Sequence, residues 1–327
     1  MTLQSLYTQT GFPVFQDRTY ATKAEAKACE LGDIDLAQDP STGVLNNRAF
    51  DPAQAIYDTD YNNEQSHSHR FQSHMDDVST LIANNMGINQ LVEVGCGKGA
   101  FLEGMVDKGA DIKSFDPTYE GSNPRIQQAY FSPEPGIEAK GLILRHVLEH
   151  IPEPIEFLKQ VANANAGKGL IYIEVPCLDW IFDHHAWFDI FYEHVNYFRM
   201  TDFERMFGRV LFAERRFGGQ YLTIIADLAT LRDPGHGPAV NWPADFAAGV
   251  SGGSDGGVVW GGASKGVIFS LLRQREDRPV VGVIDINPVK QGRYLPVTGL
   301  RVTAPEEAHT LLKPGALIHV MNPNYLD

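Results

Sequence analysis

A short glycine-rich segment carries the residues best suited to bind a ligand. An apolar run, Leu91–Val94, contains one acidic residue, Glu93, and is followed by Gly95, Gly97 and Gly99 at alternate positions. Glycine lets a backbone turn tightly and approach a ligand, and a helix that starts just after such a turn points free N–H groups at it. The pattern therefore predicts a strand, a tight turn and a helix N-terminus beside a bound cofactor. Its spacing, G-x-G-x-G, differs from the dinucleotide pattern G-x-G-x-x-G.

A carboxylate follows this turn at a useful distance. Asp116 ends the next apolar run, about 20 residues past the glycines, where an acidic side chain can accept hydrogen bonds from both hydroxyls of a ribose. A plain loop carboxylate is the alternative, and the glycine turn upstream favours the ribose role.

Acid–base and aromatic side chains are mixed in one segment, residues 179–198, which contains Tyr192-Glu193-His194. It follows a predicted strand, and open α/β sheets bind ligands beyond the carboxyl ends of their strands. Residues 57–74 are also rich in tyrosine and histidine. The spacing of His67, His69 and His74 does not match the i, i+4 pattern of a zinc-binding helix, so a substrate-facing loop that contains Tyr57 and Tyr61 is predicted instead.

The elements that must position these residues alternate between strands and helices. Strands are predicted at 90–94, 112–115, 130–131, 141–144 and 169–175, helices at 71–84, 100–108, 155–164 and 201–207, and a hairpin at 210–216 and 221–226. The helix at 201–207 is expected to open with a capping box at Thr201. Short apolar runs of this kind are typical of buried parallel strands.

Four regions are predicted along the chain. They are an irregular N-terminal lobe (1–60), a central α/β domain (61–227), a linker rich in Gly, Pro, Ser and Ala (228–256), and a C-terminal α/β unit (257–327). The last region repeats the strand, glycine turn and helix order, with strands at 258–260, 280–284 and 316–321 and a helix at 267–274. It is half of a Rossmann unit and too short for a full dinucleotide domain.

Composition narrows the classes of function. The chain has 327 residues, a net charge of −14 and a pI near 5.2, and no basic stripe is visible, so a nucleic-acid partner is disfavoured. No apolar run is long enough to cross a membrane, and the first residues do not read as a signal peptide. The three cysteines lie far apart, which argues against a disulfide framework. A cytoplasmic protein is expected, and its oligomeric state is left open.

The glycine turn with Glu93 before it resembles motif I of the class I S-adenosylmethionine (SAM) methyltransferases. The hairpin that closes the central domain is also usual for that class, and so is the H-x-L-E-H stretch that ends at His150. More of the chain is similar to one family, the C-methyltransferases of nucleotide-linked keto-deoxysugars. The similarity includes Tyr192-Glu193-His194 and the C-terminal segment D-x-N-P-x-K-Q-G-R-Y-L-P.

This resemblance implies a class I, Rossmann-like fold with SAM as cofactor. The residues that it assigns to the cofactor are Glu93, Gly95, Cys96, Gly97, Gly99, Asp116, Pro117, Arg145 and His146. It implies that His194 is the base, that Glu193 orients groups or contacts the sugar, and that Tyr192 and Tyr61 donate hydrogen bonds near the carbonyl. Without the resemblance, a packed loop histidine would be the first interpretation of His194, and a structural role is favoured for His150.

Chemistry alone supports such an arrangement. A carbon nucleophile forms when a base with a pKa near 7 removes a proton next to a carbonyl, and histidine fits. The enolate needs hydrogen-bond donors, and the methyl group must lie in line at about 3 Å. No metal is required.

The substrate side is less strongly determined. The turn at 261–266 can offer N–H groups to a phosphate, and Lys265, Lys290 and Arg293 can pair with a diphosphate. A solvated basic loop that only packs the domains together is an equal alternative. Tyr57 is expected to contact the substrate.

In the N-terminal lobe, two segments have the shape of zinc knuckles without their cysteines. Tyr7, Thr10, Asp39 and Thr42 stand at the ligand positions, so no zinc is predicted. Three other functions stay open. They are an O- or N-methyltransferase of another small metabolite, a non-catalytic SAM-binding relative, and an NAD-dependent oxidoreductase, which Glu93 and the glycine spacing disfavour.

Overall fold

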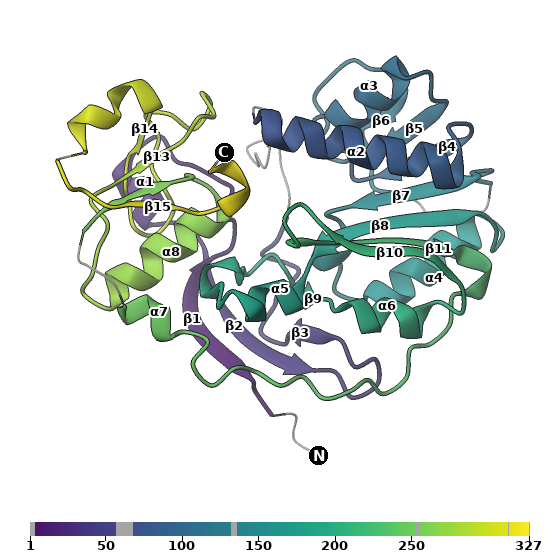
Figure 1. The fold of residues 1–327 in the computed structure, drawn as a ribbon, viewed down its shortest axis with the longest axis horizontal. Helices are drawn as coiled ribbons and strands as arrows, with labels where there is room; N and C mark the ends of the chain where they lie inside the picture. Colours follow the sequence, from purple (N-terminus) through teal and green to yellow (C-terminus); the bar gives the residue numbers. More distant parts are fainter. Residues whose placement is uncertain (1–3, 57–67, 132–135, 253–255, 313, 327) are drawn as a thin grey trace.

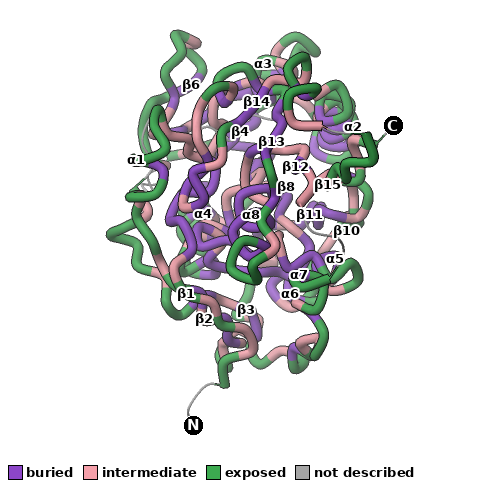
Figure 2. Tube along the Cα trace, turned by 90° about the vertical axis from the view of Figure 1, so that its left-hand side faces the viewer, coloured by how far each residue is buried: buried purple, intermediate pink, exposed green. Residues whose placement is uncertain are grey.

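The computed structural model describes residues 4–56, 68–131, 136–252, 256–312 and 314–326. Figure 1 shows two lobes side by side, with the N-terminal strands below and between them. The strands at the centre of each lobe are the most deeply buried part of the chain (Figure 2). Within the described ranges, no helix is long and apolar enough to cross a membrane.

The larger lobe is built on a 7-stranded sheet in the order β10-β11-β8-β7-β4-β5-β6. Its parallel strands are β4 (Leu91–Val94), β5 (Ile112–Phe115), β6 (Ile126–Gln127), β7 (Gly141–Arg145) and β8 (Leu170–Pro176). The hairpin of β10 (Val210–Arg216) and β11 (Tyr221–Asp227) adds antiparallel strands at one edge. This mixed sheet confirms the predicted α/β class.

Helices cover both faces of this sheet. On one face α2 (His69–Met86) and α3 (Ala100–Asp107) pack over Ile143, and on the other α4 (Pro154–Ala164) and α6 (Met200–Met206) lie on the side of Leu142 and Leu144. Because successive side chains of a strand point to opposite faces, a strand that is covered on both sides must be apolar throughout. β7 has this pattern, with four of its five residues buried.

Two local predictions in this lobe are wrong. The strand expected at Tyr130-Phe131 lies earlier, as β6, and the Phe131 ring packs against Phe115, with centroids 5.6 Å apart. The two neighbouring aromatic residues favoured a strand at this position. Instead, the Phe131 ring packs against the rings of Phe115 and Phe157. The cap of α6 is also not at Thr201, since the Asp202 carboxylate accepts the Arg199 N–H at 2.8 Å.

The sequence predicts an irregular N-terminal lobe, but this lobe has regular secondary structure. It forms an antiparallel sheet of β1 (Tyr7–Pro13), β2 (Leu31–Gln38), β3 (Leu45–Asn47) and β9 (Asn196–Tyr197), with a short helix α1 (Lys23–Lys27). The last strand comes from the segment after β8, so the pairing that completes the sheet is far away in sequence. Tyr7 and Thr10 therefore lie on β1, while Asp39 and Thr42 lie in the turn between β2 and β3.

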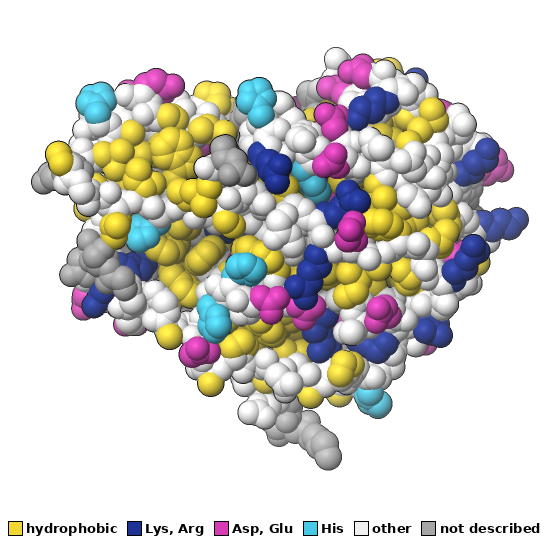
Figure 3. Space-filling model, viewed as in Figure 1, with side chains coloured by type: hydrophobic (Ala, Val, Ile, Leu, Met, Phe, Trp, Pro, Cys, Tyr) yellow, Lys and Arg dark blue, Asp and Glu magenta, His cyan; other side chains and the backbone are white. Residues whose placement is uncertain are grey.

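The smaller lobe contains the C-terminal strands. Four parallel strands run in the order β14-β13-β12-β15, namely β12 (Val258–Trp260), β13 (Gly282–Ile284), β14 (Val302–Thr303) and β15 (Ile318–Val320). Helix α8 (Ser264–Arg275) packs against the short turn η2 (Trp187–Asp189) of the larger lobe. Exposed apolar side chains gather on this lobe (Figure 3), among them Val281, Val289, Leu317 and Ile318.

The predicted linker, 228–256, is packed along much of its described length. It contains the short turn η3 (Leu228–Thr230) and the helix α7 (Ala248–Ser251). Trp242 stacks on Tyr7 of β1 with centroids 5.1 Å apart, and Phe246 is buried. The segment therefore covers the N-terminal sheet on its way between the lobes.

Candidate active site

The glycine turn after β4 is shaped by close packing on one side and by open space on the other. Gly95 has φ +77°, and a Cβ there would lie 2.5 Å from Val147 Cγ2. Gly97 has φ +56° and has no atom within 4 Å of the position of a Cβ. The first glycine is thus required by the protein itself, whereas the second faces a cavity.

We call this space the glycine-turn cavity. It has a volume of about 410 Å³, in the usual range for a small-molecule site. The structure brings to it eight of the nine residues that the resemblance assigned to the cofactor: Glu93, Gly95, Cys96, Gly97, Asp116, Pro117, Arg145 and His146. Gly99 does not line it, because it caps α3 behind the turn with φ +88°.

Asp116 ties the turn to the end of β5. Its Oδ2 accepts the Gly97 N–H at 2.6 Å, and its Oδ1 accepts the Thr118 N–H at 2.8 Å. The carboxylate is almost fully buried but still lines the cavity. The Thr118 hydroxyl also donates to Oδ1, at 2.7 Å. A carboxylate has about four acceptor positions, so one position, on Oδ2, remains for a ribose hydroxyl. The ribose role of Asp116 stays a prediction, and the geometry is compatible with it.

Glu93 and Arg145 form a second polar group in the wall of this cavity. Burial raises the pKa of Glu93 to about 7, against the opposing effect of Arg145, and Glu93 Oε2 has no hydrogen-bond partner. The Arg145 guanidinium lies 4.4 Å from the centroid of the Phe101 ring and donates to Glu174 at 3.2 Å. The Glu93 carboxyl group is therefore about half protonated near pH 7.

A second space, the interlobe cavity, has a volume of about 500 Å³. Its walls come from the N-terminal lobe, the start of α2, the ends of β7 and β8, and the C-terminal unit. Residues that carry chemistry and line it are Asp17, His69, Arg70, His146, Glu149, His150, Asp189, His194, Lys265, Asp285 and Lys290. His146 and His150 line both cavities, so the two spaces adjoin at these two side chains.

His146 stands at this junction in an unusual backbone conformation. Its φ is +53°, which is rare for a residue with a side chain and is found most often at functional sites. The ring lies between two carboxylates, with Nδ1 3.4 Å from Glu149 Oε1 and Nε2 3.3 Å from Glu174 Oε1. Burial lowers the pKa of His146, but the two carboxylates outweigh it and raise the pKa to about 9. The imidazole is therefore a cation at neutral pH.

His194 and His150 have the opposite character. Burial, followed by the charges of His150, His146 and Lys265, holds the pKa of His194 well below its usual range. His194 Nδ1 is buried without a hydrogen-bond partner. His150 Nδ1 donates to the Glu193 carbonyl at 3.0 Å, and burial lowers its pKa. A neutral imidazole is the form that can accept a proton, so His194 is available as a base in the interlobe cavity, with a pKa below the value near 7 that is best for this role.

The other two residues of the Tyr-Glu-His segment point away from this cavity. The Tyr192 hydroxyl accepts the Asp51 N–H at 2.8 Å and donates to Gln54 at 3.1 Å. Glu193 is fully buried and accepts the Gln16 N–H at 3.2 Å. The structure thus does not bring these side chains to a substrate, because they hold the segment against the N-terminal lobe. Tyr57 and Tyr61 lie outside the described residues.

The three predicted phosphate-binding cations differ in position. Lys265 lines the interlobe cavity, with Nζ 2.8 Å from Asp189 Oδ2. Lys290 also lines it, and Nζ lies 3.8 Å from Asp17 Oδ1. Arg293 does not, because its guanidinium donates to the Thr19 carbonyl at 2.6 Å.

Sequence reasoning missed several groups of this cavity. Asp17 and Arg70 carry no motif of their own, and Glu149 lies in the H-x-L-E-H stretch but was assigned no role there. Asp285 had a usable signal, because it ends a strand that follows a glycine turn, as Asp116 does. Asp285 Oδ2 accepts the Gly262 N–H at 2.6 Å, which repeats the contact between Asp116 and Gly97.

Part of this chain is similar in sequence to known methyltransferases. Residues 66–212 match a family described as "Methyltransferase domain". The C-methyltransferase NovU of Streptomyces niveus is 29% identical over 143 residues, which cover 39% of this chain and 34% of NovU. The match thus spans about a third of that relative.

Two solved structures that are partly similar to this chain have TM-scores below 0.5. The PH0226 protein from Pyrococcus horikoshii OT3 has a TM-score of 0.41 at 13% identity, covering 54% of this chain and 99% of that protein. The 1,6-didemethyltoxoflavin-N1-methyltransferase of Burkholderia thailandensis, which was solved with S-adenosylhomocysteine, has a TM-score of 0.36 at 14% identity, covering 47% of this chain and 77% of that enzyme.

The family match and the sheet agree on one conclusion. Residues 66–212 contain β4, the glycine turn and most of the 7-stranded sheet, and they form a class I SAM-dependent methyltransferase domain. This domain is of the class that uses SAM as its cofactor.

Proposed function

We propose that this protein is a C-methyltransferase that acts on a nucleotide-linked keto-deoxysugar. The observation that carries this proposal is the junction of the two cavities at His146 and His150, with the unpartnered imidazole of His194 on the interlobe side. A methyl donor in the glycine-turn cavity then faces an acceptor in the interlobe cavity. The similarity to NovU, a C-methyltransferase, supports carbon as the acceptor atom.

In this proposal, His194 removes a proton from the carbon next to the keto group of the sugar. The resulting enolate carbon attacks the methyl group of SAM, and S-adenosylhomocysteine leaves. The cationic ring of His146 lies at the junction, where its charge offsets the negative charge that develops on the enolate oxygen. The negative charges of Glu149 and Glu174 keep this ring protonated.

The C-terminal unit is proposed to hold the nucleotide. The hydrogen bonds of its turn after β12 resemble those of the glycine turn after β4. Asp285 accepts the Gly262 N–H at 2.6 Å and the Asn287 N–H at 2.7 Å, as Asp116 accepts those of Gly97 and Thr118. The C-terminal turn lies against the same cavity as His194. A ribose and a phosphate could be bound there, with Lys265 and Lys290 close by.

The position of the transferred methyl group tests this function. We expect ¹³C-methyl-labelled SAM and a panel of nucleotide-linked keto-deoxysugars to give a product whose labelled methyl group is bonded to a ring carbon in ¹H–¹³C correlation spectra. Label on an oxygen or nitrogen atom would contradict the proposed carbon chemistry. Absence of transfer to every keto sugar, with SAM binding confirmed by calorimetry, would contradict the proposed substrate class.

A further inference from the structure

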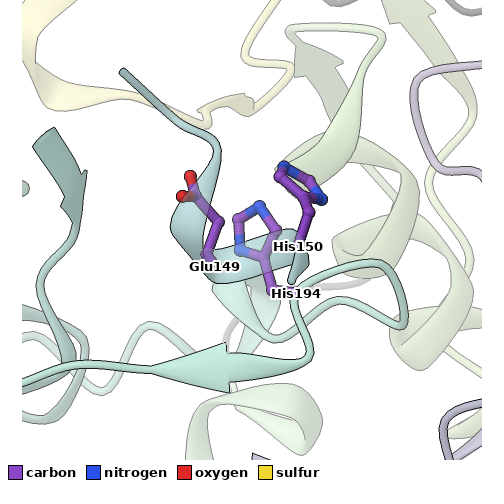
Figure 4. A group of neighbouring side chains, drawn as sticks. All are labelled: Glu149, His150 and His194. Carbon is purple, nitrogen blue, oxygen red and sulfur yellow. The ribbon is translucent and has the colours of Figure 1, made fainter. Parts of the chain in front are cut away.

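Glu149, His150 and His194 form a cluster with the composition of a metal site. One donor atom from each residue lies within 4.8 Å of the other two. Glu149 and His150 come from the turn η1 (Leu148–His150), and His194 comes from the loop before β9. Figure 4 shows the three side chains converging from these two segments. No sequence motif predicts this cluster, because His194 lies far along the chain from Glu149 and His150.

The donor set suits a divalent ion such as Zn²⁺. Two imidazole nitrogens and one carboxylate oxygen are ordinary zinc ligands, with bonds of about 2.0–2.2 Å. Donors at tetrahedral angles around such an ion lie about 3.3 Å apart. The present separations are at most 4.8 Å, so rotations of the side chains are sufficient to close the site. Three protein ligands beside a cavity leave a fourth position for water or a ligand oxygen.

Two of the donors have hydrogen-bonding capacity that the protein does not use. The Glu149 side chain is only 1% exposed, and neither of its carboxylate oxygens has a hydrogen-bond partner among the described residues. His194 Nδ1 is likewise buried and unpartnered. Burying polar groups in this state is costly, and such groups call for a partner from outside the chain.

The third donor is already oriented. His150 Nδ1 donates to the Glu193 carbonyl at 3.0 Å, so the lone pair of this ring is on Nε2. Metal-bound histidines are commonly fixed by such a bond to a backbone carbonyl. The competing contact is the ion pair between Glu149 and His146 at 3.4 Å, whose geometry is too poor for a hydrogen bond.

We propose that Glu149, His150 and His194 bind Zn²⁺, and that the bound ion inhibits the enzyme. The binding follows from the donor geometry alone. The inhibition rests on the proposed function, because an ion bound to His194 takes up the lone pair that would accept the proton of the sugar. Zinc should therefore compete with the acceptor.

Metal binding is measured on the full-length protein, purified and stripped with a chelator. We expect one equivalent of Zn²⁺ to bind in calorimetry, and Co²⁺ to give the visible absorption of a four-coordinate site. Glu149→Gln and His194→Gln should each weaken Zn²⁺ binding at least about 10-fold. His309→Gln, an exposed histidine outside both cavities, is the control and should bind Zn²⁺ as the wild type does.

Absence of saturable Zn²⁺ binding to the wild type would overturn the proposal. The same holds if both variants fold, as shown by circular dichroism, and bind Zn²⁺ like the wild type. The inhibition is tested separately, by methyl transfer at increasing Zn²⁺ and acceptor concentrations. Zinc that binds at the cluster without competing with the acceptor would contradict inhibition alone. If no acceptor is methylated at all, the proposed function fails, while the binding result still decides on the metal site.

Discussion

Replacement of His194 with glutamine is expected to lower the rate of methyl transfer by about 10²–10⁴-fold, the usual contribution of a general base. The side chain lines the interlobe cavity, and its Nδ1 has no protein partner. Glutamine keeps a polar side chain of similar length but cannot take up a proton. Because His194 does not line the glycine-turn cavity, the dissociation constant of SAM should stay within about twofold.

The measurement pairs steady-state methyl transfer with a calorimetric titration of SAM. His309→Gln is the matched control, since it makes the same chemical change at an exposed position and should retain wild-type activity. If His194→Gln methylated its acceptor at the wild-type rate, the base would have to be another residue. A loss of SAM binding in this variant would instead indicate a structural role.

Replacement of Glu174 with glutamine is expected to lower the free energy of unfolding by about 3–5 kcal/mol, the cost of leaving a buried charge without its partner. Glu174 is fully buried at the end of β8 and accepts hydrogen bonds from Arg145 at 3.2 Å and Tyr172 at 2.8 Å. His74 and His146 lie 3.1 Å and 3.3 Å from it. Without the carboxylate, the cations Arg145 and His146 remain in the interior.

The pH dependence of this loss has a definite sign. Burial acts to raise the pKa of Glu174, but Arg145, His146 and His74 outweigh it and hold the pKa well below 4.5. In the unfolded chain this carboxyl group takes up a proton near pH 4.5, whereas in the folded protein it stays ionised. Its contribution to stability is therefore present above pH 4.5 and is lost as the pH falls through the folded pKa.

Urea denaturation of the wild type and of Glu174→Gln at several pH values measures both effects. The difference between the two proteins should be largest near neutral pH and should shrink below pH 4.5. Glu214→Gln is the control, because the exposed ion pair of Glu214 with Arg216 should contribute less than about 1 kcal/mol. A loss of that small size in Glu174→Gln would show that the buried network does not stabilise the fold.

The central sheet could be predicted because its strands carry a local signal. Parallel strands that are covered on both faces are apolar along their length, so runs such as Leu91–Val94 and Gly141–Leu144 stand out as short apolar segments. Helix α2 was found from its periodic apolar face, with Val78, Leu81 and Ile82 buried. In both cases, the residues that define the element are neighbours in sequence.

The N-terminal sheet could not be predicted for the opposite reason. Strand β1 alternates half-buried and exposed residues and contains Gly11 at an irregularity, so it has no strong apolar pattern. Strand β3 pairs with β9, where Leu45 lies opposite Tyr197. No residue near β3 in the sequence indicates that its partner is β9. This pairing is seen only in the folded structure, where the segment after β8 returns to the N-terminal sheet.

The site divides in the same way. The glycine-turn cavity is formed largely by the ends of adjacent strands. Lining residues such as Glu93 and Asp116 could therefore be predicted from the sequence around each strand. The interlobe cavity is assembled from both lobes and the N-terminal sheet, and Asp17, Arg70 and Glu149 emerge only from the fold. Within Tyr192-Glu193-His194, sequence could not show which side chains face the cavity, and the structure places only His194 there.

Exchange of the sugar proton tests the central claim most directly, which is that the interlobe cavity makes a carbon nucleophile before methyl transfer. The wild-type protein is incubated in D₂O with S-adenosylhomocysteine, which cannot donate a methyl group, and with a nucleotide-linked keto-deoxysugar. We predict that deuterium replaces the proton on the carbon next to the keto group, as seen by NMR and mass spectrometry. A keto sugar that binds and is methylated, yet shows no exchange above the protein-free rate, would contradict this mechanism.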